Sequence, residues 1–150
     1  MVVHRIARRP FIQDLSGYGA RTYGGRWNSV GTAVVYTAGS LSLALLELLV
    51  HVERPVPEDF WRIELDVPDS DISEFPLAKL PTDWEAPIPT EGLQKIGDGF
   101  VAAGKYLGLK LPSSVNPQEW NLIINPAHPR FSAVRVVGPF PQPLDKRLYR

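Results

Sequence analysis

Alternating apolar and polar side chains predict several short β-strands in this chain. The clearest case is residues 59–68, where Ile63, Leu65 and Val67 alternate with charged residues. A period of two is typical of a strand that is buried on one face. Segments rich in β-branched residues extend this pattern along the chain. Further strands are predicted over residues 2–7, 32–38, 109–115 and 131–141, with a strand or a turn over 119–126.

Two other segments have the residue spacing of helices. Ser40 is a typical N-cap for a helix that continues to about His51, before Pro55. Apolar residues cover nearly every direction of this helix, which predicts that it is buried. Residues 91–108 place large apolar side chains three or four positions apart, as in an amphipathic helix that glycines weaken.

The order of these elements indicates the fold class. Short strands and two helices alternate irregularly, which favours an α+β fold with a small, mixed, partly antiparallel sheet and flanking helices. Residues 1–150 are expected to form a single domain. Residues 13–31 hold five glycines and are predicted to form a long loop. Residues 69–90 are acidic and proline-rich, and we expect a surface loop with one helical turn at most.

Composition narrows the classes of function. Sixteen basic residues balance sixteen acidic ones, so the net charge favours neither a nucleic-acid backbone nor an anionic membrane as the main partner. The absence of cysteine excludes disulfides, thiolate catalysis and thiolate metal sites. The three histidines match no metal-ligand spacing. No apolar run is long enough to span a bilayer, and the N-terminus lacks the apolar region of a signal peptide, so a cytoplasmic protein is expected.

One carboxylate, Glu47, interrupts the leucine-rich helical segment SLSLALLELLVH. An ionised carboxylate resists burial unless it has a partner. Glu47 and His51 are four residues apart and therefore share a helix face. Two interpretations stay open at this point. The pair forms a weak contact at a solvated helix edge, or Glu47 points from a buried helix into a cleft where the charge has a purpose.

A glycine-rich loop, GARTYGGRWN over residues 19–28, combines features that suit a nucleotide. Gly24 and Gly25 allow positive φ, which can bring backbone N–H groups together into an anion-binding nest. The neighbouring Arg26 offers forked donors for phosphate oxygens, and Trp27 offers a flat ring. The alternative is a glycine hairpin with Trp27 anchored in the core. The loop has neither a Walker sequence nor a Rossmann fingerprint.

Small hydroxyls and amides gather between prolines in residues 111–129. Ser113, Ser114 and Asn121 belong to this segment. Rigid prolines can fix such donors around a ligand, although ordinary Asx and Ser turns explain the same composition. The chain has no G-x-S-x-G elbow, which argues against a serine hydrolase.

Several of these segments, taken in order, resemble the RES domain, which is named for an arginine, a glutamate and a serine. The resemblance extends over nearly the whole chain and is carried by HRI (4–6), GGRWN (24–28), VVYTA (34–38), ALLELLVH (44–51), TEGLQKIGDGF (90–100), LPSSV (111–115) and NLIINPAHP (121–129). It implies an ADP-ribosyltransferase-like fold and a toxin that consumes NAD. It also implies neutralisation by an Xre-type helix-turn-helix antitoxin, with no direct nucleic-acid or membrane binding, and allows a homodimer within that complex.

The resemblance also assigns roles to residues. Ser113 matches the named serine better than Ser114, which fills the small position that follows it. The implied catalytic residues are Glu47, Arg26 and Ser113, and the implied NAD-binding residues are Arg5, Arg26, Tyr36 and Asn121.

The hypothesis that follows is cleavage of the nicotinamide–ribose bond of NAD, with water or phosphate as acceptor. NAD is then a substrate, and no prosthetic group or metal is expected. Glu47 would stabilise an oxocarbenium-like transition state while arginines bind the pyrophosphate. Ser113 would either contact the nicotinamide side or orient Glu47. Two alternatives remain: a protein ADP-ribosyltransferase toxin, and a non-catalytic nucleotide-binding module.

Overall fold

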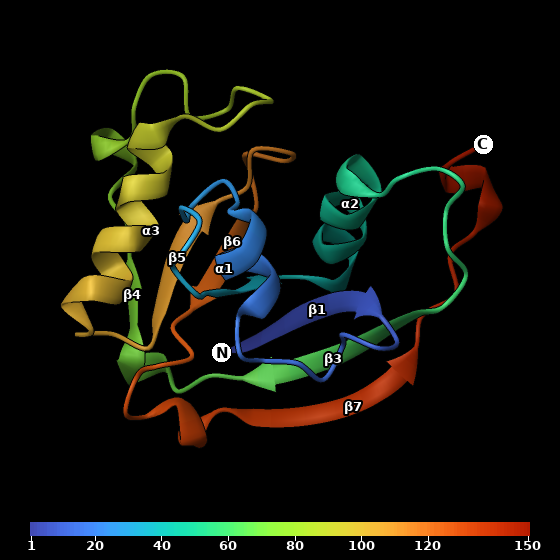
Figure 1. Ribbon diagram of the computed structural model, residues 1–150, viewed down its shortest axis with the longest axis horizontal. Coiled ribbons are helices and arrows are strands. Elements are labelled where there is room, and N and C mark those ends of the chain that lie inside the picture. Colours follow the sequence, from blue (N-terminus) through green and yellow to red (C-terminus); the bar gives the residue numbers. More distant parts are fainter.

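Seven strands make one sheet in the order β4-β5-β6-β2-β1-β3-β7 in the computed structural model, which describes residues 1–150 (Figure 1). Only β4 and β5 run parallel, and all other neighbours are antiparallel, which confirms the α+β class. The strands are β1 (Val2–Arg8), β2 (Val35–Ala38), β3 (Phe60–Asp66), β4 (Ile72–Glu74), β5 (Gly108–Pro112), β6 (Trp120–Ile124) and β7 (Arg135–Pro141). The α-helices are α1 (Tyr18–Tyr23), α2 (Leu41–His51) and α3 (Glu91–Ala103).

The sheet divides between β1 and β2. These two strands share a single registered pair, His4 with Ala38, whereas β1 and β3 are paired from Val2 to Arg8. In Figure 1, β1, β3 and β7 run together across the view, while β5 and β6 run at a steep angle to them. The two halves of the sheet therefore separate beyond His4 and leave room for a cleft.

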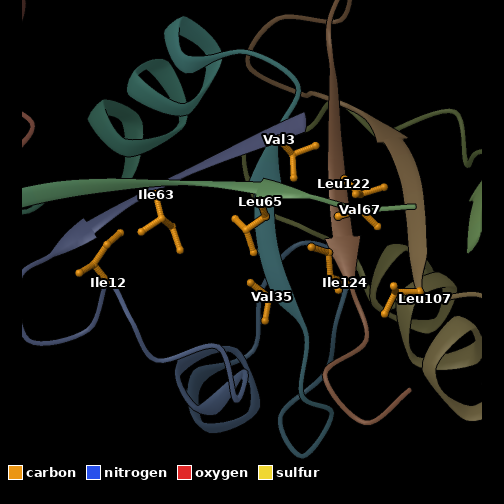
Figure 2. Packing of buried hydrophobic residues seen from close by; sticks show 9 residues of the cluster. All are labelled: Val3, Ile12, Val35, Ile63, Leu65, Val67, Leu107, Leu122 and Ile124. Carbon is orange, nitrogen blue, oxygen red and sulfur yellow. The ribbon is translucent and has the colours of Figure 1, made fainter. Parts of the chain in front are cut away.

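Buried side chains on one face tie the two halves together, as Figure 2 shows. This cluster consists of Val3, Ile12, Val35, Ile63, Leu65, Val67, Leu107, Leu122 and Ile124. A second cluster lies between the sheet and α3 and consists of Trp27, Val34, Leu93, Leu109, Leu111 and Ile123. The alternation predicted for residues 59–68 is therefore confirmed, because Ile63, Leu65 and Val67 are all fully buried.

Helix α2 begins as the sequence predicts but is less buried than expected. The Ser40 hydroxyl oxygen accepts a hydrogen bond from the Leu43 backbone N–H at 3.1 Å. The helix packs on β1 and β2 with Leu43 and Ala44 buried. Leu46 and Val50, on its outer side, are 41% and 57% exposed. The prediction of a fully buried helix was wrong because no other element covers that side.

Other differences from the sequence analysis have local causes. The predicted loop over residues 13–31 contains α1, and the predicted loop over 69–90 contains β4, which adds to the sheet edge beside β5. Helix α3 ends at Ala103 instead of residue 108 because Gly104 turns left-handed with φ 59°. None of the helices combines the length and the apolar composition that crossing a membrane requires.

Candidate active site

A cavity of about 580 Å³ opens where the two halves of the sheet separate. Strands β1, β2 and β6, helices α2 and α3, and the glycine-rich loop all contribute to its walls. This volume lies within the range of small-molecule and cofactor sites. Among the residues assigned from the sequence, those on the walls are Arg5, Arg26, Tyr36, Glu47 and Asn121.

The Glu47 carboxylate is held at one of its two oxygens. Oε1 accepts a hydrogen bond from the Ser113 hydroxyl at 2.8 Å and another from the Asn121 side-chain amide at 2.7 Å. Oε2 has no partner within the protein. Two donors on one oxygen fix the rotation of the carboxylate and leave the other oxygen available to a ligand. The second interpretation of Glu47, as a charge directed into a cleft, agrees with this geometry.

Ser113 uses its whole hydrogen-bonding capacity inside the protein. The residue is fully buried, and its hydroxyl oxygen accepts from the backbone N–H groups of Val115 and Asn116 at 3.1 Å each. A hydroxyl has one proton and two lone pairs, so the proton is left for Glu47. Of the two roles expected for Ser113, the geometry therefore supports orientation of Glu47 over contact with a ligand. Ser114, in contrast, lies on the cavity wall.

Arg26 is bound to a proline-rich segment that we name the strap, residues 81–89. Its Nη1 donates to the Trp84 carbonyl at 3.0 Å and its Nη2 to the Pro87 carbonyl at 3.3 Å. Burial lowers the pKa of the guanidinium, and the nearby Glu47 carboxylate opposes this shift. Arg26 thus faces the cavity with part of its donor fork already occupied by carbonyl oxygens.

Of the two interpretations of the glycine-rich loop, the anion-binding nest is not observed. The Gly24 N–H donates to the Ala20 carbonyl at 2.8 Å, and the Gly25 N–H donates to the Asn28 carbonyl at 3.0 Å. These donors close the loop and do not converge on the cavity. Trp27 is 2% exposed, so the alternative of a glycine hairpin with an anchored tryptophan is the one observed.

Tyr36 supports this loop with its hydroxyl. The hydroxyl donates to Asn28 Oδ1 at 2.6 Å and accepts from the Trp27 backbone N–H at 3.0 Å. Burial raises the pKa of the phenol far above its ordinary range, so the hydroxyl is protonated. A Cβ on Gly25 would lie 2.6 Å from the Tyr36 hydroxyl oxygen, which explains why a glycine stands there.

Asn28 is a supporting residue that the sequence analysis quoted within GGRWN without assigning it a role. It is fully buried, and its amide nitrogen donates to the carbonyls of Ala20 and Thr32. The two hydrogen bonds hold the loop against the end of α1. The only signal in the sequence was an asparagine directly after Trp27 in a glycine-rich loop.

Arg5 lines the cavity because strands β1 and β2 separate there. It alternates with His4 and Ile6 along β1, yet all three line the cavity because β1 and β2 separate beyond His4. Its Nη2 donates to the Phe11 carbonyl at 3.1 Å, and its Nε is buried without a partner. Burial lowers the pKa of this guanidinium, and Asp14 opposes the shift.

Other residues line the cavity that were not assigned from the sequence, among them His4, Gln94 and His51. His51 was noted only as a neighbour of Glu47 on the helix. The structure brings together no group of three or more acidic or histidine side chains that could hold a metal ion.

The fold and this site define an α+β protein with an oriented carboxylate and two guanidinium groups around one ligand-sized cavity. The model of the RES domain matches residues 2–145, and the chain therefore belongs to the RES domain family. A protein named Toxin Res from Photorhabdus laumondii is 39% identical over 128 residues, which cover 84% of this chain and 82% of that protein.

Two further comparisons are informative. A protein from a Sphingobium species named Prs ADP-ribosylating toxin is 38% identical over 133 residues, covering 86% of this chain and 83% of that protein. Among solved structures, one from the Mycobacterium tuberculosis MbcT–MbcA toxin–antitoxin complex matches with a TM-score of 0.77 and 21% identity, covering 99% of this chain and 86% of that one. The structural match supports the fold.

Proposed function

We propose that this chain is a toxin that cleaves the nicotinamide–ribose bond of NAD and transfers ADP-ribose to water or phosphate. The observation that carries the proposal is the Glu47 carboxylate, held at Oε1 by Ser113 and Asn121 and open at Oε2 toward the cavity it shares with Arg5 and Arg26. NAD is a cytoplasmic metabolite, so the proposal places the activity in the cytoplasm.

Bond cleavage would develop charge next to Glu47. The electron pair of the C–N bond leaves with nicotinamide, which departs as a neutral molecule, and positive charge remains on the ribose. A carboxylate close to that carbon stabilises the charge, and the apolar side chains beside it on the cavity wall, Ala44 and Leu48, strengthen its field. Water or phosphate then attacks the ribose carbon, and water releases a proton when it forms the new hydroxyl.

The two arginines would bind the pyrophosphate in different ways. The Nε of Arg5 is buried and has no hydrogen-bond partner, and a phosphate oxygen can be that partner. Arg26 can exchange the strap carbonyls of Trp84 and Pro87 for phosphate oxygens, because both are acceptors of the same N–H groups. Tyr36 would contribute its ring to the wall, since its hydroxyl is committed to Asn28.

A direct assay tests the proposal. The purified protein is incubated with NAD, with and without phosphate, and free nicotinamide is measured by chromatography. We expect nicotinamide to appear in step with the loss of NAD, and a Glu47→Gln preparation made in parallel to release almost none. Equal release by the two preparations would show that Glu47 is not the catalytic carboxylate, and no release by either would refute NAD cleavage.

The second candidate is transfer of ADP-ribose to a protein. The name of the Sphingobium relative, an ADP-ribosylating toxin 38% identical to this chain, favours it. NAD labelled in its adenylate part separates the two candidates when it is added to a bacterial lysate with the protein. Label on a protein band indicates a transferase, and label only in ADP-ribose or its phosphorylated form indicates the hydrolytic or phosphorolytic reaction.

An antitoxin partner belongs to the same proposal. The solved structural neighbour comes from a toxin–antitoxin complex, and we propose that an Xre-type helix-turn-helix protein neutralises this chain in a similar way. Growth of bacteria expressing the chain alone, and together with a helix-turn-helix protein encoded beside it, tests the partner. Rescue of growth with recovery of NAD supports the pairing, and continued loss of NAD contradicts it. Whether the toxin is a homodimer in that complex is measured by light scattering.

A further inference from the structure

Three neighbouring strands place His4, Ala38 and Asn121 in one row. His4 is registered with Ala38, and Ala38 with Asn121, so the three side chains share one face of the sheet. The middle residue is small, and Ala44 of α2 packs against it in the same apolar cluster. Both alanines line the cavity together with the two longer polar side chains. We name this part of the wall the alanine slot: His4, Ala38, Ala44 and Asn121.

The polar ends of the alanine slot are unsatisfied. His4 Nδ1 and Asn121 Oδ1 are both buried and have no hydrogen-bond partner, and both residues line the cavity. Buried polar atoms in folded proteins nearly always have a partner. The cavity has three exceptions, since Arg5 Nε is the third, and the two in the slot indicate a ligand that supplies partners to both.

The chemistry of that ligand follows from the orientation of Asn121. Its amide nitrogen donates to Glu47 Oε1, which can only accept, so the buried atom of this cavity-lining side chain that has no partner is the amide oxygen. It therefore requires a donor from the ligand. His4, at the other end, can donate from Nδ1 in one neutral tautomer. The slot thus fits a group that donates on one side and accepts on the other.

The walls of the slot are apolar. Ile6 and Leu48 line the cavity beside the two alanines. Apolar walls with one polar group at each end suit an aromatic ring that carries a primary carboxamide. A ring carboxylate fits poorly, because it has no N–H for Asn121 and brings a negative charge next to Glu47.

We propose that His4 and Asn121 bind the carboxamide of nicotinamide in the alanine slot, with its NH₂ donating to Asn121 Oδ1 and its carbonyl accepting from His4. This inference rests on the proposed function, because nicotinamide is the leaving group of NAD cleavage. It goes further by making His4 a specificity-determining residue. Since Asn121 also holds Glu47, one side chain would place the leaving group and the charge that stabilises its departure next to each other.

Binding of free nicotinamide tests the slot without catalysis. Titrations of wild-type protein with nicotinamide and with nicotinic acid, followed by NMR or calorimetry, are compared with those of His4→Phe, His4→Gln and His51→Phe. His4→Phe keeps a ring and removes the donor, His4→Gln restores an N–H donor, and His51→Phe makes the same exchange at an exposed histidine on the same cavity. Amide spectra of each variant check the fold.

We expect nicotinamide to bind about tenfold more weakly to His4→Phe, with partial recovery in His4→Gln and little change in His51→Phe. Wild type should favour nicotinamide over nicotinic acid by at least that factor. Equal affinity for nicotinamide in wild type and folded His4→Phe would overturn the inference, as would absence of nicotinamide binding to wild type.

The same measurements separate this inference from the proposed function. If the protein binds nicotinamide through His4 but releases none from NAD, the slot is supported and the proposed reaction is refuted. If the protein cleaves NAD but wild type and His4→Phe bind nicotinamide with identical affinity, the proposed reaction is supported and the slot is refuted.

Discussion

Glu47 and Arg26 face the same cavity, but the protein holds them by different means. Glu47 is fixed by the side chains of Ser113 and Asn121, which lie 66 and 74 residues further along the chain. Arg26 is fixed by two backbone carbonyls of the strap. Ser113 is fully buried, whereas Pro87 of the strap is exposed.

The difference indicates how the two charges would work. A carboxylate held by two side-chain donors is preorganised, and substrate binding does not have to move it. A guanidinium held by carbonyl oxygens on a surface segment can exchange these acceptors for phosphate oxygens at little cost. We therefore expect changes at Glu47 and its partners to alter the chemical step, and changes at Arg26 to alter substrate binding and the strap.

The largest expected effect comes from Glu47→Gln. The amide removes the negative charge while its oxygen still accepts from Ser113 and Asn121, so the fold should persist. Loss of a preorganised electrostatic group lowers kcat by about 10²–10³, and we expect at least that loss in nicotinamide release. Unfolding in urea serves as the control, and a midpoint close to that of wild type combined with lost activity identifies a chemical role.

Ser113→Ala tests whether the hydrogen bonds that hold Glu47 matter for the chemical step. It removes one donor to Glu47 and leaves the N–H groups of Val115 and Asn116 without an acceptor. An unpaired buried donor costs about 1–3 kcal/mol, and we expect a loss of stability of that size with a kcat lower by about tenfold and little change in KM. Ser114→Ala, on the cavity wall, is the matched control. A greater loss of kcat in Ser114→Ala would transfer the role of the named serine to that residue.

Arg26→Lys tests the other side of the comparison. An ammonium cannot span the carbonyls of Trp84 and Pro87 as the planar guanidinium does. We expect KM for NAD to rise about tenfold with a smaller change in kcat, because a bidentate contact is lost. Amide hydrogen exchange should become faster in the strap, residues 81–89.

The matched control for this change is Arg21→Lys. Arg21 is exposed, lies over the Tyr18 ring at 5.8 Å, and does not line the cavity. Similar KM values for the Arg26 and Arg21 variants would contradict a role of Arg26 in binding NAD, and unchanged exchange in the strap would show that the two carbonyl contacts do not hold it.

The comparison of Glu47 with Arg26 also shows which parts of the site can be predicted from the sequence. The leucine-rich helix with its single carboxylate is a local pattern, and the Ser40 cap follows from it. The direction of Glu47 does not, because the pattern left both a solvated helix edge and a cleft open. The donors to Glu47 depend on the adjacency of β5, β6 and β2, which no local pattern contains. His4 was missed for a similar reason, since strand alternation does not reveal where two strands stop pairing.

The glycine-rich loop shows a second limit of prediction. Gly24 and Gly25 were compatible with a nest, because adjacent glycines allow backbone N–H groups to converge, and equally with a hairpin. Their N–H groups are used inside the loop instead, and Gly25 is required because the Tyr36 hydroxyl leaves no space for a Cβ. The residue type was informative, but the reason for it is a side-chain contact that lies outside the local sequence.

The smallest expected effect is at the base of that loop, in Tyr36→Phe. Removing the hydroxyl leaves Trp27 N–H and Asn28 Oδ1 unpaired and should raise KM only a few-fold by loosening the loop around Arg26. A distinct signature lies in the pH dependence of stability. Because burial raises the pKa of Tyr36 above its unfolded value of 10, the folded state keeps a proton that the unfolded state loses.

That contribution to stability is present below pH 10 and is lost as pH rises above it. One group of this kind changes the free energy of unfolding by about 1.4 kcal/mol per pH unit. Urea unfolding at pH 9 and pH 11 should therefore show a smaller loss of stability for Tyr36→Phe than for wild type. Tyr23→Phe is the control because Tyr23 is 81% exposed. Parallel losses in wild type and Tyr36→Phe would mean that the phenol is not buried as the loop geometry requires.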